Sequence, residues 1–401
     1  MKIAIAGYGV EGEASYRYWR MRGEVAIADE RLDFEGPAGV EIIRGPEAFS
    51  QLDSYDLIIR SPGVAPEKLP YGNKVWSATN EFFAVCAQMN LPIIGVTGTK
   101  GKGTTSSLIA SILKATGRSV HLVGNIGQPA LDLLDDIDQA DIVVYELSSF
   151  QLWDLSRSPQ VAVVLPVEPD HLDVHADFKD YLAAKANIAK FQQPENVIIY
   201  NKANSYARSI AQYSAARVQL EYPFDLGTLA ENVQLPGAHN LENAAAAILA
   251  ARQFTDDELA IAQGLRGFKG LDHRLKLVRD LAGVRFYDDS ISTTPGSAIA
   301  AIKAFDEPKT IILGGSDKGA KYTDIIELCQ ATATKVIATG QTGKQVQQLC
   351  LEQGVDCHYV EDMSAAVSTA WRLSEPGSVV LLSPASASFD QYDNYAQRGD
   401  E

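Results

Sequence analysis

The chain has 401 residues, which at roughly 150 residues per domain corresponds to two or three domains. Apolar residues make up 46% of it and charged residues 21%, a composition typical of globular proteins and unlike that of disordered chains. The 35 Lys and Arg against 51 Asp and Glu give a net charge of −16, which argues against nucleic acid or an anionic membrane as the main partner.

The apolar runs and the cysteines of the sequence indicate in which compartment the protein works. The longest uninterrupted apolar run is eight residues, Ala244–Ala251, whereas a helix needs about 20 apolar residues to span a bilayer. The first residues lack the charged and long apolar regions of a signal peptide. The four cysteines have no CxxC spacing and suit burial in a reducing compartment (Cys86, Cys329, Cys350 and Cys357). The sequence therefore predicts a cytoplasmic multidomain protein.

Short β-branched runs alternate with helical stretches along nearly the whole chain, a pattern typical of parallel α/β sheets. Strands are predicted at Ile3–Ala6, Val25–Ala28, Leu57–Arg60, Ile93–Thr97, Val120–Val123, Ile142–Leu147, Val161–Leu165, Val197–Tyr200, Leu275–Arg279, Val284–Asp288, Thr310–Leu313, Lys335–Ala338 and Val379–Leu382. Helices are predicted at Lys102–Ala115, Tyr181–Phe191, Asn240–Arg252, Gly296–Phe305 and Ala365–Leu373.

A glycine-rich turn, Gly7-Tyr-Gly-Val-Glu-Gly12, follows the first predicted strand. Asp29 ends the next strand, 20 residues after Gly9, as in the dinucleotide-binding fingerprint, in which the acidic residue holds a ribose. A nicotinamide cofactor is one of several ligands that such a turn can hold. A tight turn without a ligand is the alternative interpretation.

The strongest local signal is a second glycine-rich loop, Gly98-Thr-Lys-Gly-Lys102-Gly103-Thr-Thr105, between a strand and a helix that begins near Lys102. Backbone N–H groups of such a loop and of the helix N-terminus form a cradle for phosphates. Lys102 is placed to reach the terminal phosphates, and a hydroxyl just inside the helix to bind Mg²⁺. The strict P-loop pattern is not met, because Val96 stands at its first glycine and Gly103 follows the lysine. A glycine turn with solvated lysines is the alternative.

A third group begins where a predicted strand reaches Glu146, beside Ser148 and Ser149. A carboxylate at a neighbouring strand end is well placed to hold Mg²⁺, and His171 is a further candidate ligand. His171 and His175 also have the i,i+4 spacing of metal ligands, although a solvated or capping role is the simpler interpretation of His175.

Weaker signals come from polar residues that ordinary structure would explain. Lys185 lies on an Ala-rich helix and, taken alone, is a solvated lysine, while Asn240 and Asn243 suit helix caps. The serine-rich segment Ser383–Asp390 after a strand is a further loop of a type that can bind anions.

The two glycine-rich turns predict two separate nucleotide-type domains, with a boundary between them near Asn90. Gly267, Gly270 and Asp272 mark a second boundary, so we expect three α/β domains.

Together and in this order, the motifs resemble those of the Mur ligase family over essentially the whole chain, and most of all its D-glutamate-adding branch. The matching motifs are the Gly7 turn, Ser61–Val64, Thr97–Lys102, Gly124–Gly127, Glu146–Gln151, Asp170–Asp173, Ala184-Lys185, Gly237–Asn243, His273-Arg274, Asp288–Ser290, Leu313–Lys318 and Ser383–Gln391. The resemblance implies a Rossmann-like UDP-substrate domain (residues 1–89), a P-loop-type central ATPase domain (residues 90–269) and a Rossmann-like, amino-acid-binding C-terminal domain (residues 270–401).

By this resemblance the chain is an ATP-dependent amide ligase that adds D-glutamate to UDP-N-acetylmuramoyl-L-alanine, in cytoplasmic synthesis of peptidoglycan precursors. A carboxylate is a poor acyl donor, so ATP converts it to an acyl phosphate, which the amine of D-glutamate attacks. The implied cofactors are ATP, two Mg²⁺ ions and a carbamylated Lys185. We expect a monomer with no nucleic-acid or membrane partner.

The resemblance also implies the residues of each site. UDP-substrate contacts, in place of NAD, are expected from Gly9, Val10, Glu11, Asp29, Glu30, Ser61, Gly63, Asn125 and Ser148. ATP contacts are expected from Gly98, Thr99, Lys100, Gly101, Lys102, Gly103, Thr104, Thr105, Asn240, Asn243, Arg274 and Asp289. D-Glutamate contacts are expected from His171, Thr293, Lys318, Ser388, Phe389 and Tyr395, and metal ligands are Thr104, Glu146, His171 and carbamylated Lys185. The catalytic set is Lys102, Glu146, His171, Lys185 and Lys318.

Some positions depart from the family pattern. Lys100 stands where the family loop usually has Asn, and Gly103 where it has Ser or Thr, which leaves the metal hydroxyl open between Thr104 and Thr105. Pro166 and Ile291 also differ from the usual Asn and Lys. Relatives usually continue past Glu401 with a helical stretch, so we expect an early stop, natural or trimmed.

Three alternatives stay open at this point. The first is another amide ligase of the superfamily, either similar to folylpolyglutamate synthetases or specific for a different amino acid. The second is a non-catalytic nucleotide-binding relative, against which the joint presence of Lys102, Glu146, His171 and Lys185 argues. The third is an NAD-dependent dehydrogenase, which would leave the second glycine-rich loop unused.

Overall fold

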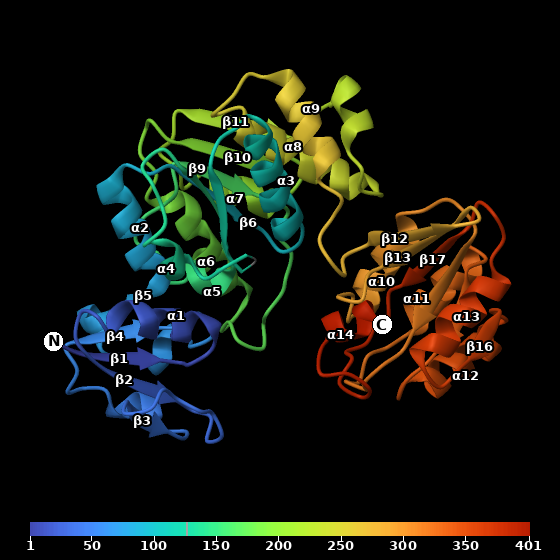
Figure 1. Ribbon diagram of the computed structural model, residues 1–401, viewed down its shortest axis with the longest axis horizontal. Helices are drawn as coiled ribbons and strands as arrows, with labels where there is room; N and C mark the ends of the chain where they lie inside the picture. The colour runs from blue at the N-terminus through green and yellow to red at the C-terminus, as the bar shows by residue number, and fades with distance from the viewer. Residues whose placement is uncertain (126) are drawn as a thin grey trace. The chain divides into compact units, whose positions relative to one another are not determined.

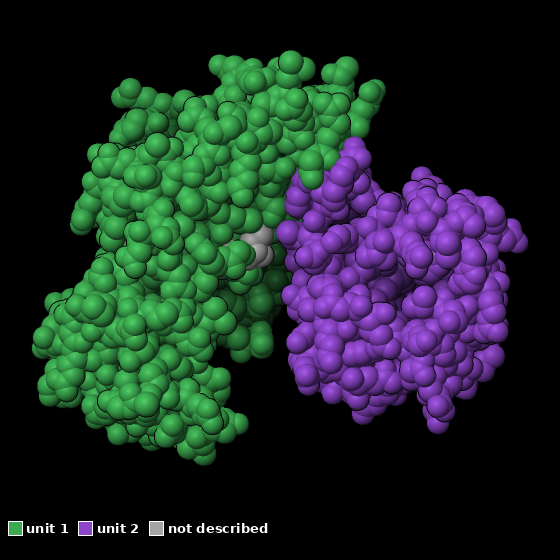
Figure 2. Space-filling model, viewed as in Figure 1, with its two compact units in different colours: residues 1–232, 242–267 green, residues 233–241, 268–401 purple. Residues whose placement is uncertain are grey.

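The computed structural model describes residues 1–125 and 127–401. The described chain forms two compact units, residues 1–232 with 242–267 and residues 233–241 with 268–401 (Figure 2). Two β-sheets belong to the first unit and one to the second, each with helices packed on it (Figure 1). The predicted α/β class is confirmed. The division into domains at residues 89/90 and 269/270 stays a prediction.

The first sheet has the strand order β3-β2-β1-β4-β5, and all of its pairings are parallel. Its strands are β1 (Lys2–Ala6), β2 (Glu24–Asp29), β3 (Glu41–Arg44), β4 (Leu57–Arg60) and β5 (Val75–Ser77). Helix α1 (Val10–Trp19) follows β1 and helix α2 (Ala78–Met89) follows β5, with short 3₁₀ turns at Ala48–Gln51, Pro66–Lys68 and Gly72–Lys74.

The second sheet has the order β11-β10-β9-β6-β8-β7, again entirely parallel. Its strands are β6 (Ile93–Thr97), β7 (Val120–Gly124), β8 (Ile142–Glu146), β9 (Val161–Val164), β10 (Val197–Asn201) and β11 (Val218–Tyr222). The helices are α3 (Lys102–Ala115), α4 (Ala130–Leu133), α5 (Ser149–Leu152), α6 (Phe178–Lys190), α7 (Ser205–Ala211), α8 (Ala238–Ala251) and α9 (Glu258–Gly267), with a 3₁₀ turn at Gly227–Asn232.

The third sheet has the order β12-β13-β17-β14-β15-β16, in which only the pairing of β12 with β13 is antiparallel. Its strands are β12 (Lys276–Leu281), β13 (Val284–Asp288), β14 (Lys309–Leu313), β15 (Lys335–Ala338), β16 (Cys357–Tyr359) and β17 (Val379–Leu382). The helices are α10 (Pro295–Lys303), α11 (Thr323–Ala331), α12 (Gly343–Gln353), α13 (Met363–Leu373) and α14 (Tyr395–Asp400).

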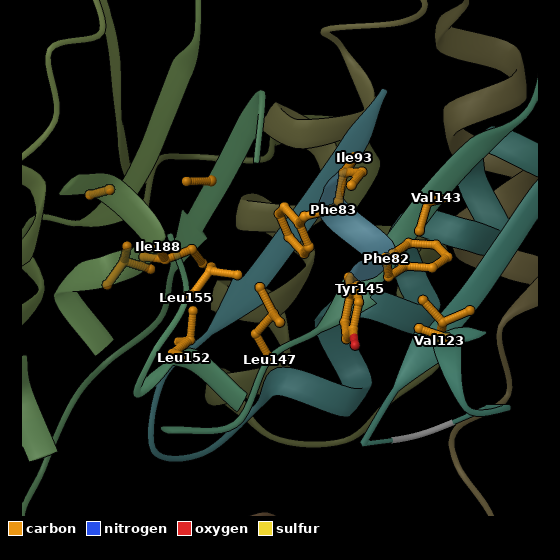
Figure 3. Close-up of a cluster of buried hydrophobic side chains, with 14 of the residues drawn as sticks. Phe82, Phe83, Ile93, Val123, Val143, Tyr145, Leu147, Leu152, Leu155 and Ile188 are labelled. Carbon is orange, nitrogen blue, oxygen red and sulfur yellow. The ribbon is translucent and has the colours of Figure 1, made fainter. Parts of the chain in front are cut away.

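Helix α2 packs on the second sheet, although the predicted boundary at residue 89 assigns it to the first domain. Phe82 and Phe83 place their rings 5.6 and 5.7 Å from the ring of Tyr145 in β8. Figure 3 shows both rings beside Tyr145 in a cluster of buried apolar side chains. Burial of aromatic surface of this kind is a main source of folding free energy.

Four strands were not predicted from the sequence: β3, β5, β11 and β16. All four lie at the edges of their sheets. An edge strand has one neighbour and solvent-exposed positions, so it lacks the continuous apolar run that marks an inner strand. Glu41-Ile-Ile-Arg44 and Val218-Gln-Leu-Glu-Tyr222 show this mixed composition.

The predicted burial of cysteines is confirmed for Cys86, Cys329 and Cys350, while Cys357 is half-buried, and all four thiols are free. Among the described residues, the helices are all too short or too polar to cross a membrane.

The packing of α2 predicts a large loss of stability when Phe82 is truncated. Phe82→Ala should lower the free energy of unfolding by about 3–5 kcal/mol, because the ring is fully buried and leaves a cavity. The exposed Leu259, 75% accessible, is the control, since Leu259→Ala should change the free energy by less than about 0.5 kcal/mol. Urea unfolding followed by circular dichroism measures both. A small effect at Phe82 would show that α2 does not contribute to this core.

Candidate functional site

The predicted phosphate loop connects β6, which ends at Thr97, to α3, which begins at Lys102. Gly101 occupies the N-cap position with φ +84° and carries no side chain that could cap the helix. A Cβ at Gly101 would lie 2.5 Å from Asn243 Oδ1, and one at Gly98 would lie 2.6 Å from Leu165 Cβ. Only glycine fits these two positions, and no side chain caps the N-terminus of α3, which is the kind of helix start that binds anions.

Lys102 and Thr99 fix the conformation of this loop. Lys102 Nζ donates to the carbonyl oxygens of Gly98, at 3.2 Å, and Thr99, at 3.0 Å. Thr99 Oγ1 accepts from the backbone N–H of Glu168 at 2.9 Å and hydrogen-bonds with Tyr181 Oη at 3.0 Å. The loop is therefore held against the segment that follows β9, while Lys100 is exposed.

Two buried hydroxyls follow the loop inside α3. Thr105 is fully buried, and its Oγ1 donates to Asn243 Oδ1 at 3.3 Å. Thr104 is 6% exposed and lies one position closer to the loop. The structure thus brings Asn243 to the phosphate loop and gives the Thr105 hydroxyl a protein partner.

Glu146 ends β8, the neighbour of β6, and lies opposite Val96 in the parallel register. Asn125 contacts it twice, since its backbone N–H donates to the Glu146 carbonyl at 3.2 Å and its Nδ2 donates to Glu146 Oε1 at 3.3 Å. Ser148 follows as the N-cap of α5, with its hydroxyl and backbone engaged in a capping box with Gln151. Glu146 is 3% exposed, and its position in the register puts it at the strand end from which the phosphate loop leaves β6.

Lys185 is buried, which corrects the interpretation of a lone solvated lysine. Its Nζ donates to the carbonyl oxygen of Gly98 at 2.8 Å and to Thr97 Oγ1 at 3.4 Å, and lies 4.6 Å from the ring centre of Tyr181. Burial first, and the nearby charge of Lys102 second, hold the pKa of the Lys185 ammonium well below its usual range. Burial at this position therefore disfavours the charged form of the amine relative to a lysine in water.

His171 and His175 occupy different environments. His171 is about half-exposed, with φ +53° and its ring 4.9 Å from that of Phe150. The expectation that His175 is solvated or capping is wrong, because it is 2% exposed, with Nδ1 2.8 Å from Asp180 Oδ2 and Nε2 3.0 Å from Ser149 Oγ. Both ring nitrogens of His175 therefore have protein partners, and the side chain connects the residues after His171 to α5 and α6. It does not form a metal-ligand pair with His171.

The predicted metal ligands fit a Mg²⁺ ion that is shared with substrate phosphates and water, and they do not form a site made of protein side chains alone. Within residues 1–125 and 127–401, no three His, Cys, Asp or Glu side chains gather closely enough to hold a metal ion. Thr104, Glu146, His171 and carbamylated Lys185 are the predicted ligands. Mg²⁺ commonly binds through one or two carboxylates together with substrate phosphates and water, so this oxygen-rich set beside an anion cradle fits it.

In the first sheet, the Gly7 turn, Asp29 and Ser61 come together at the carboxyl ends of β1, β2 and β4. Asp29 Oδ2 accepts from the backbone N–H of Tyr8 at 2.7 Å, and Ser61 Oγ donates to the Gly7 carbonyl at 2.6 Å. Burial alone would raise the pKa of Asp29, but hydrogen bonds from Arg31 and from backbone N–H groups outweigh it and hold the pKa below its usual range. A Cβ at Gly7, where φ is +87°, would lie 2.9 Å from Val64.

The other predicted UDP-site residues surround this turn. Gly9 is the N-cap of α1, Val10 is 70% exposed, and Glu30 forms an ion pair with Lys68 at 2.6 Å. Glu11 accepts from Gln151 Nε2 at 3.0 Å, and burial raises the pKa of its carboxyl. Gly63 lies in the loop after β4.

In the second unit, Asp289 follows β13 and is buried. Its carboxylate accepts from Ser383 Oγ at 2.6 Å and from the backbone N–H of Leu275 at 3.1 Å. Burial raises the pKa of Asp289 to about 6, although these hydrogen bonds and one from Ser292 act in the opposite direction. The structure thereby joins the loop after β13 to the serine-rich loop after β17.

The remaining predicted residues of the second unit lie at or near its loops. Lys318 Nζ lies 5.0 Å from the ring centre of Phe389, which is 63% exposed. Ser388 is buried, and Tyr395 is partly exposed with its ring 6.0 Å from that of His273. Arg274 and Thr293 are half-buried, and the buried Asn240 donates to the Pro236 carbonyl at 2.7 Å.

Two buried arginines lie outside the set selected from the sequence. Arg60, 1% exposed, ends β4 and pairs with Asp154. Arg398, 2% exposed, donates to Ser290 Oγ at 2.9 Å and to the Ser386 carbonyl at 3.0 Å, so it links the two loops beside Asp289. The only available signal was their position next to selected motifs, because burial of a charge cannot be read from its neighbours in sequence.

Comparison with known proteins gives consistent matches. The family model of the Mur ligase middle domain matches residues 96–225, and that of the Mur ligase, glutamate ligase domain matches residues 273–386. A curated UDP-N-acetylmuramoylalanine–D-glutamate ligase of Symbiobacterium thermophilum is 34% identical over 443 residues, which covers 99% of this chain and 96% of that protein. The protein of the same name from Streptococcus mutans is 32% identical, covering 100% and 95%. The crystal structure of UDP-N-acetylmuramate-alanine ligase from Thermotoga maritima shares the fold, with a TM-score of 0.60, 18% identity and coverage of 100% and 98%.

The raised pKa of Asp289 predicts a pH dependence of stability. Its pKa is 3.8 in its ordinary state and about 6 in the fold, so the fold favours the protonated acid. The preference of the fold for the protonated acid adds about 3 kcal/mol to the free energy of unfolding. This stabilisation is fully present below pH 3.8 and is lost as the pH rises through about 6. Urea unfolding of the wild type and Asp289→Asn at pH 4 and 7.5 should show the wild type losing stability relative to the variant. Equal differences at both pH values would contradict the raised pKa.

Proposed function

This chain belongs to the Mur ligase family, and on that premise we propose that it joins D-glutamate to UDP-N-acetylmuramoyl-L-alanine at the expense of ATP. The observation that carries the proposal is the convergence of the phosphate loop, Glu146 and the buried Lys185 at one edge of the second sheet. Both the Symbiobacterium and the Streptococcus relatives bear the name of this activity and align over nearly the whole chain.

The first sheet is the proposed anchor of the UDP moiety. The Gly7 turn presents the N-terminus of α1, where backbone N–H groups favour a diphosphate. Asp29 and the Ser61–Gly63 loop lie beside this turn and are the proposed contacts of the ribose and the uracil. Asn125 and Ser148 extend the contacts toward the end of β8.

The second sheet is the proposed place of phosphoryl transfer from ATP to the substrate carboxylate. The N–H groups of residues 98–105 hold the phosphates, and Lys102 offsets the charge that develops on the transferred group. Mg²⁺, when bound, supplies further charge neutralisation, with Glu146, His171 and the Thr104 hydroxyl as its protein ligands. Thr104 is preferred to Thr105 because the Thr105 hydroxyl already donates to Asn243. Asn240, Arg274 and Asp289 are the proposed ATP contacts of the second unit.

The second unit is the proposed binding place of D-glutamate. Lys318 is an ammonium beside the exposed ring of Phe389 and suits a carboxylate of the amino acid. Thr293, Ser388, Tyr395 and His171 are the further residues proposed to contact D-glutamate. The attacking amine then meets the acyl phosphate, and the phosphate leaves as the amide bond forms.

Carbamylation of Lys185 belongs to this proposal. The side chain is buried, and its pKa is well below the usual range, so the neutral amine needed to attack CO₂ is available. The nitrogen forms a bond to the carbon of CO₂ and releases one proton, which leaves a carbamate anion. This anion balances Lys102 and offers oxygen atoms to a metal, which an unmodified lysine cannot do. We also propose a cytoplasmic location, because nucleotide-activated precursors and ATP are cytoplasmic compounds, and we propose a monomer.

The carbamate proposal predicts that Lys185→Ala abolishes ligase activity while the chain stays folded. A short carboxylate such as acetate should restore part of the activity, because it can enter the cavity left by the side chain. Lys190→Ala, an exposed lysine on the same helix, is the matched control and should keep its activity. Phosphate release measured with and without acetate decides the point. Full activity of Lys185→Ala without acetate would overturn the role of the carbamate.

The amino-acid specificity predicts the outcome of a substrate panel. With UDP-N-acetylmuramoyl-L-alanine and ATP, phosphate release should require D-glutamate, and it should stay at background with L-lysine or meso-diaminopimelate. Folate substrates with L-glutamate test the folylpolyglutamate alternative. Lys318→Ala should raise the KM for D-glutamate by about tenfold or more and leave the KM for ATP unchanged, because it removes one charged hydrogen bond. Release with another amino acid and not with D-glutamate would overturn the proposed function.

A further inference from the structure

Arg60 is a buried cation at the end of an inner strand. It is the last residue of β4, it precedes the Ser61–Val64 loop, and its side chain is 1% exposed. A buried guanidinium costs several kcal/mol of desolvation unless its five N–H donors find partners. The hydrogen-bond partners of Arg60 fall into two groups. One is the loop that follows β4, and the other is the segment that follows β8 of the second sheet.

The first group is the loop that Arg60 itself precedes. Nη1 of Arg60 donates to the carbonyl oxygen of Val64 at 3.0 Å and lies 3.4 Å from those of Ser61 and Pro62. Ser61 in turn donates to the carbonyl of Gly7. One guanidinium edge therefore gathers the carbonyl groups of the loop and sets its shape beside the Gly7 turn.

The second group follows β8 of the second sheet. Nε and Nη2 of Arg60 each donate to one carboxylate oxygen of Asp154 at 2.8 Å, and Nη2 also donates to the Phe150 carbonyl at 2.9 Å. Phe150 lies in α5, four residues after Glu146. The carbonyl of Asp154 accepts from Asn80 Nδ2 at 2.8 Å, which adds a second link from α2.

We propose that Arg60 is a positioning residue that holds the uridine-nucleotide loop in register with the end of β8. The inference rests on the proposed function, in which residues 61–63 contact the nucleotide and the segment after β8 lies near the reacting carboxylate. The two ends of the substrate are far apart in its covalent structure. A rigid connection between their binding segments therefore converts nucleotide binding into correct placement of the carboxylate.

The test compares a full with a truncated substrate. Arg60→Lys cannot reproduce the bidentate and carbonyl contacts of the guanidinium. It should lower kcat/KM for UDP-N-acetylmuramoyl-L-alanine about 10- to 100-fold. For N-acetylmuramoyl-L-alanine 1-phosphate, which has no uridine, the loss should be less than about threefold, because this substrate does not use the loop.

Arg17→Lys is the matched control. Arg17 in α1 forms a bidentate pair with Asp132, at 2.9 and 2.7 Å, but this pair is 48% and 29% exposed and does not touch the loop. Exposed pairs contribute little, so both substrates should keep kcat/KM within about twofold. An equal loss for both substrates in Arg60→Lys would overturn the proposal and leave a general structural role.

Binding of UDP alone provides a readout independent of ligation. By calorimetry, Arg60→Lys should bind UDP about tenfold more weakly and ATP unchanged, and unchanged UDP affinity would overturn the proposal. Asp154→Asn, which keeps the arginine but removes its anionic partner, should act in the same direction and replaces Arg60→Lys if that variant fails to fold. A wild type that binds UDP but does not use D-glutamate overturns the proposed function, while the comparison of UDP affinities still decides the role of Arg60.

Discussion

The parallel pairing of β6 with β8 is the constraint on which the site in the first unit depends. In its register Val96 lies opposite Glu146, so the phosphate loop and the carboxylate leave the sheet at the same edge. β9 pairs on the other side of β6 and leads to the segment that contacts Thr99. A shift by one residue would turn Glu146 to the other face of the sheet, which makes the register itself a requirement of the chemistry.

Charge is the second organising feature, because the proposed substrates are all anions and the chain carries a net charge of −16. Attraction over long range therefore cannot drive their binding. The structure instead concentrates donors locally. Glycines at positions 98 and 101 let the loop pack closely against Leu165 and Asn243, and Lys102 Nζ donates to the loop carbonyl oxygens. Lys185 Nζ donates to the carbonyl oxygen of Gly98 in the same loop, and burial holds the pKa of this ammonium well below its usual range.

The inner strands and the phosphate loop could be predicted from the sequence because their signals are local. β4, β6, β13, β15 and β17 have the predicted bounds, and α3 begins at Lys102 as expected. What could not be predicted depends on contacts distant in sequence. The edge strands β3 and β16 become strands through their single neighbours. The burial of His175 depends on Asp180, Ser149 and the ring of Phe150, and its i,i+4 spacing to His171 carries no information about these partners.

The pair of Arg60 with Asp154 shows why a distant contact of this kind is hard to read and still informative. A buried ion pair gains little net stability, because the desolvation of both charges offsets their attraction, and well-packed apolar residues would often serve as well. An apolar pair, however, would not order three carbonyl groups of one loop and a carbonyl of α5 around a single planar group. The buried arginine therefore contributes little to the free energy of unfolding, and its main effect is to fix the orientation of the groups that it hydrogen-bonds. Because Arg60 connects the loop beside the Gly7 turn to the segment after β8, this orientation sets how the two proposed substrate-binding segments are aligned.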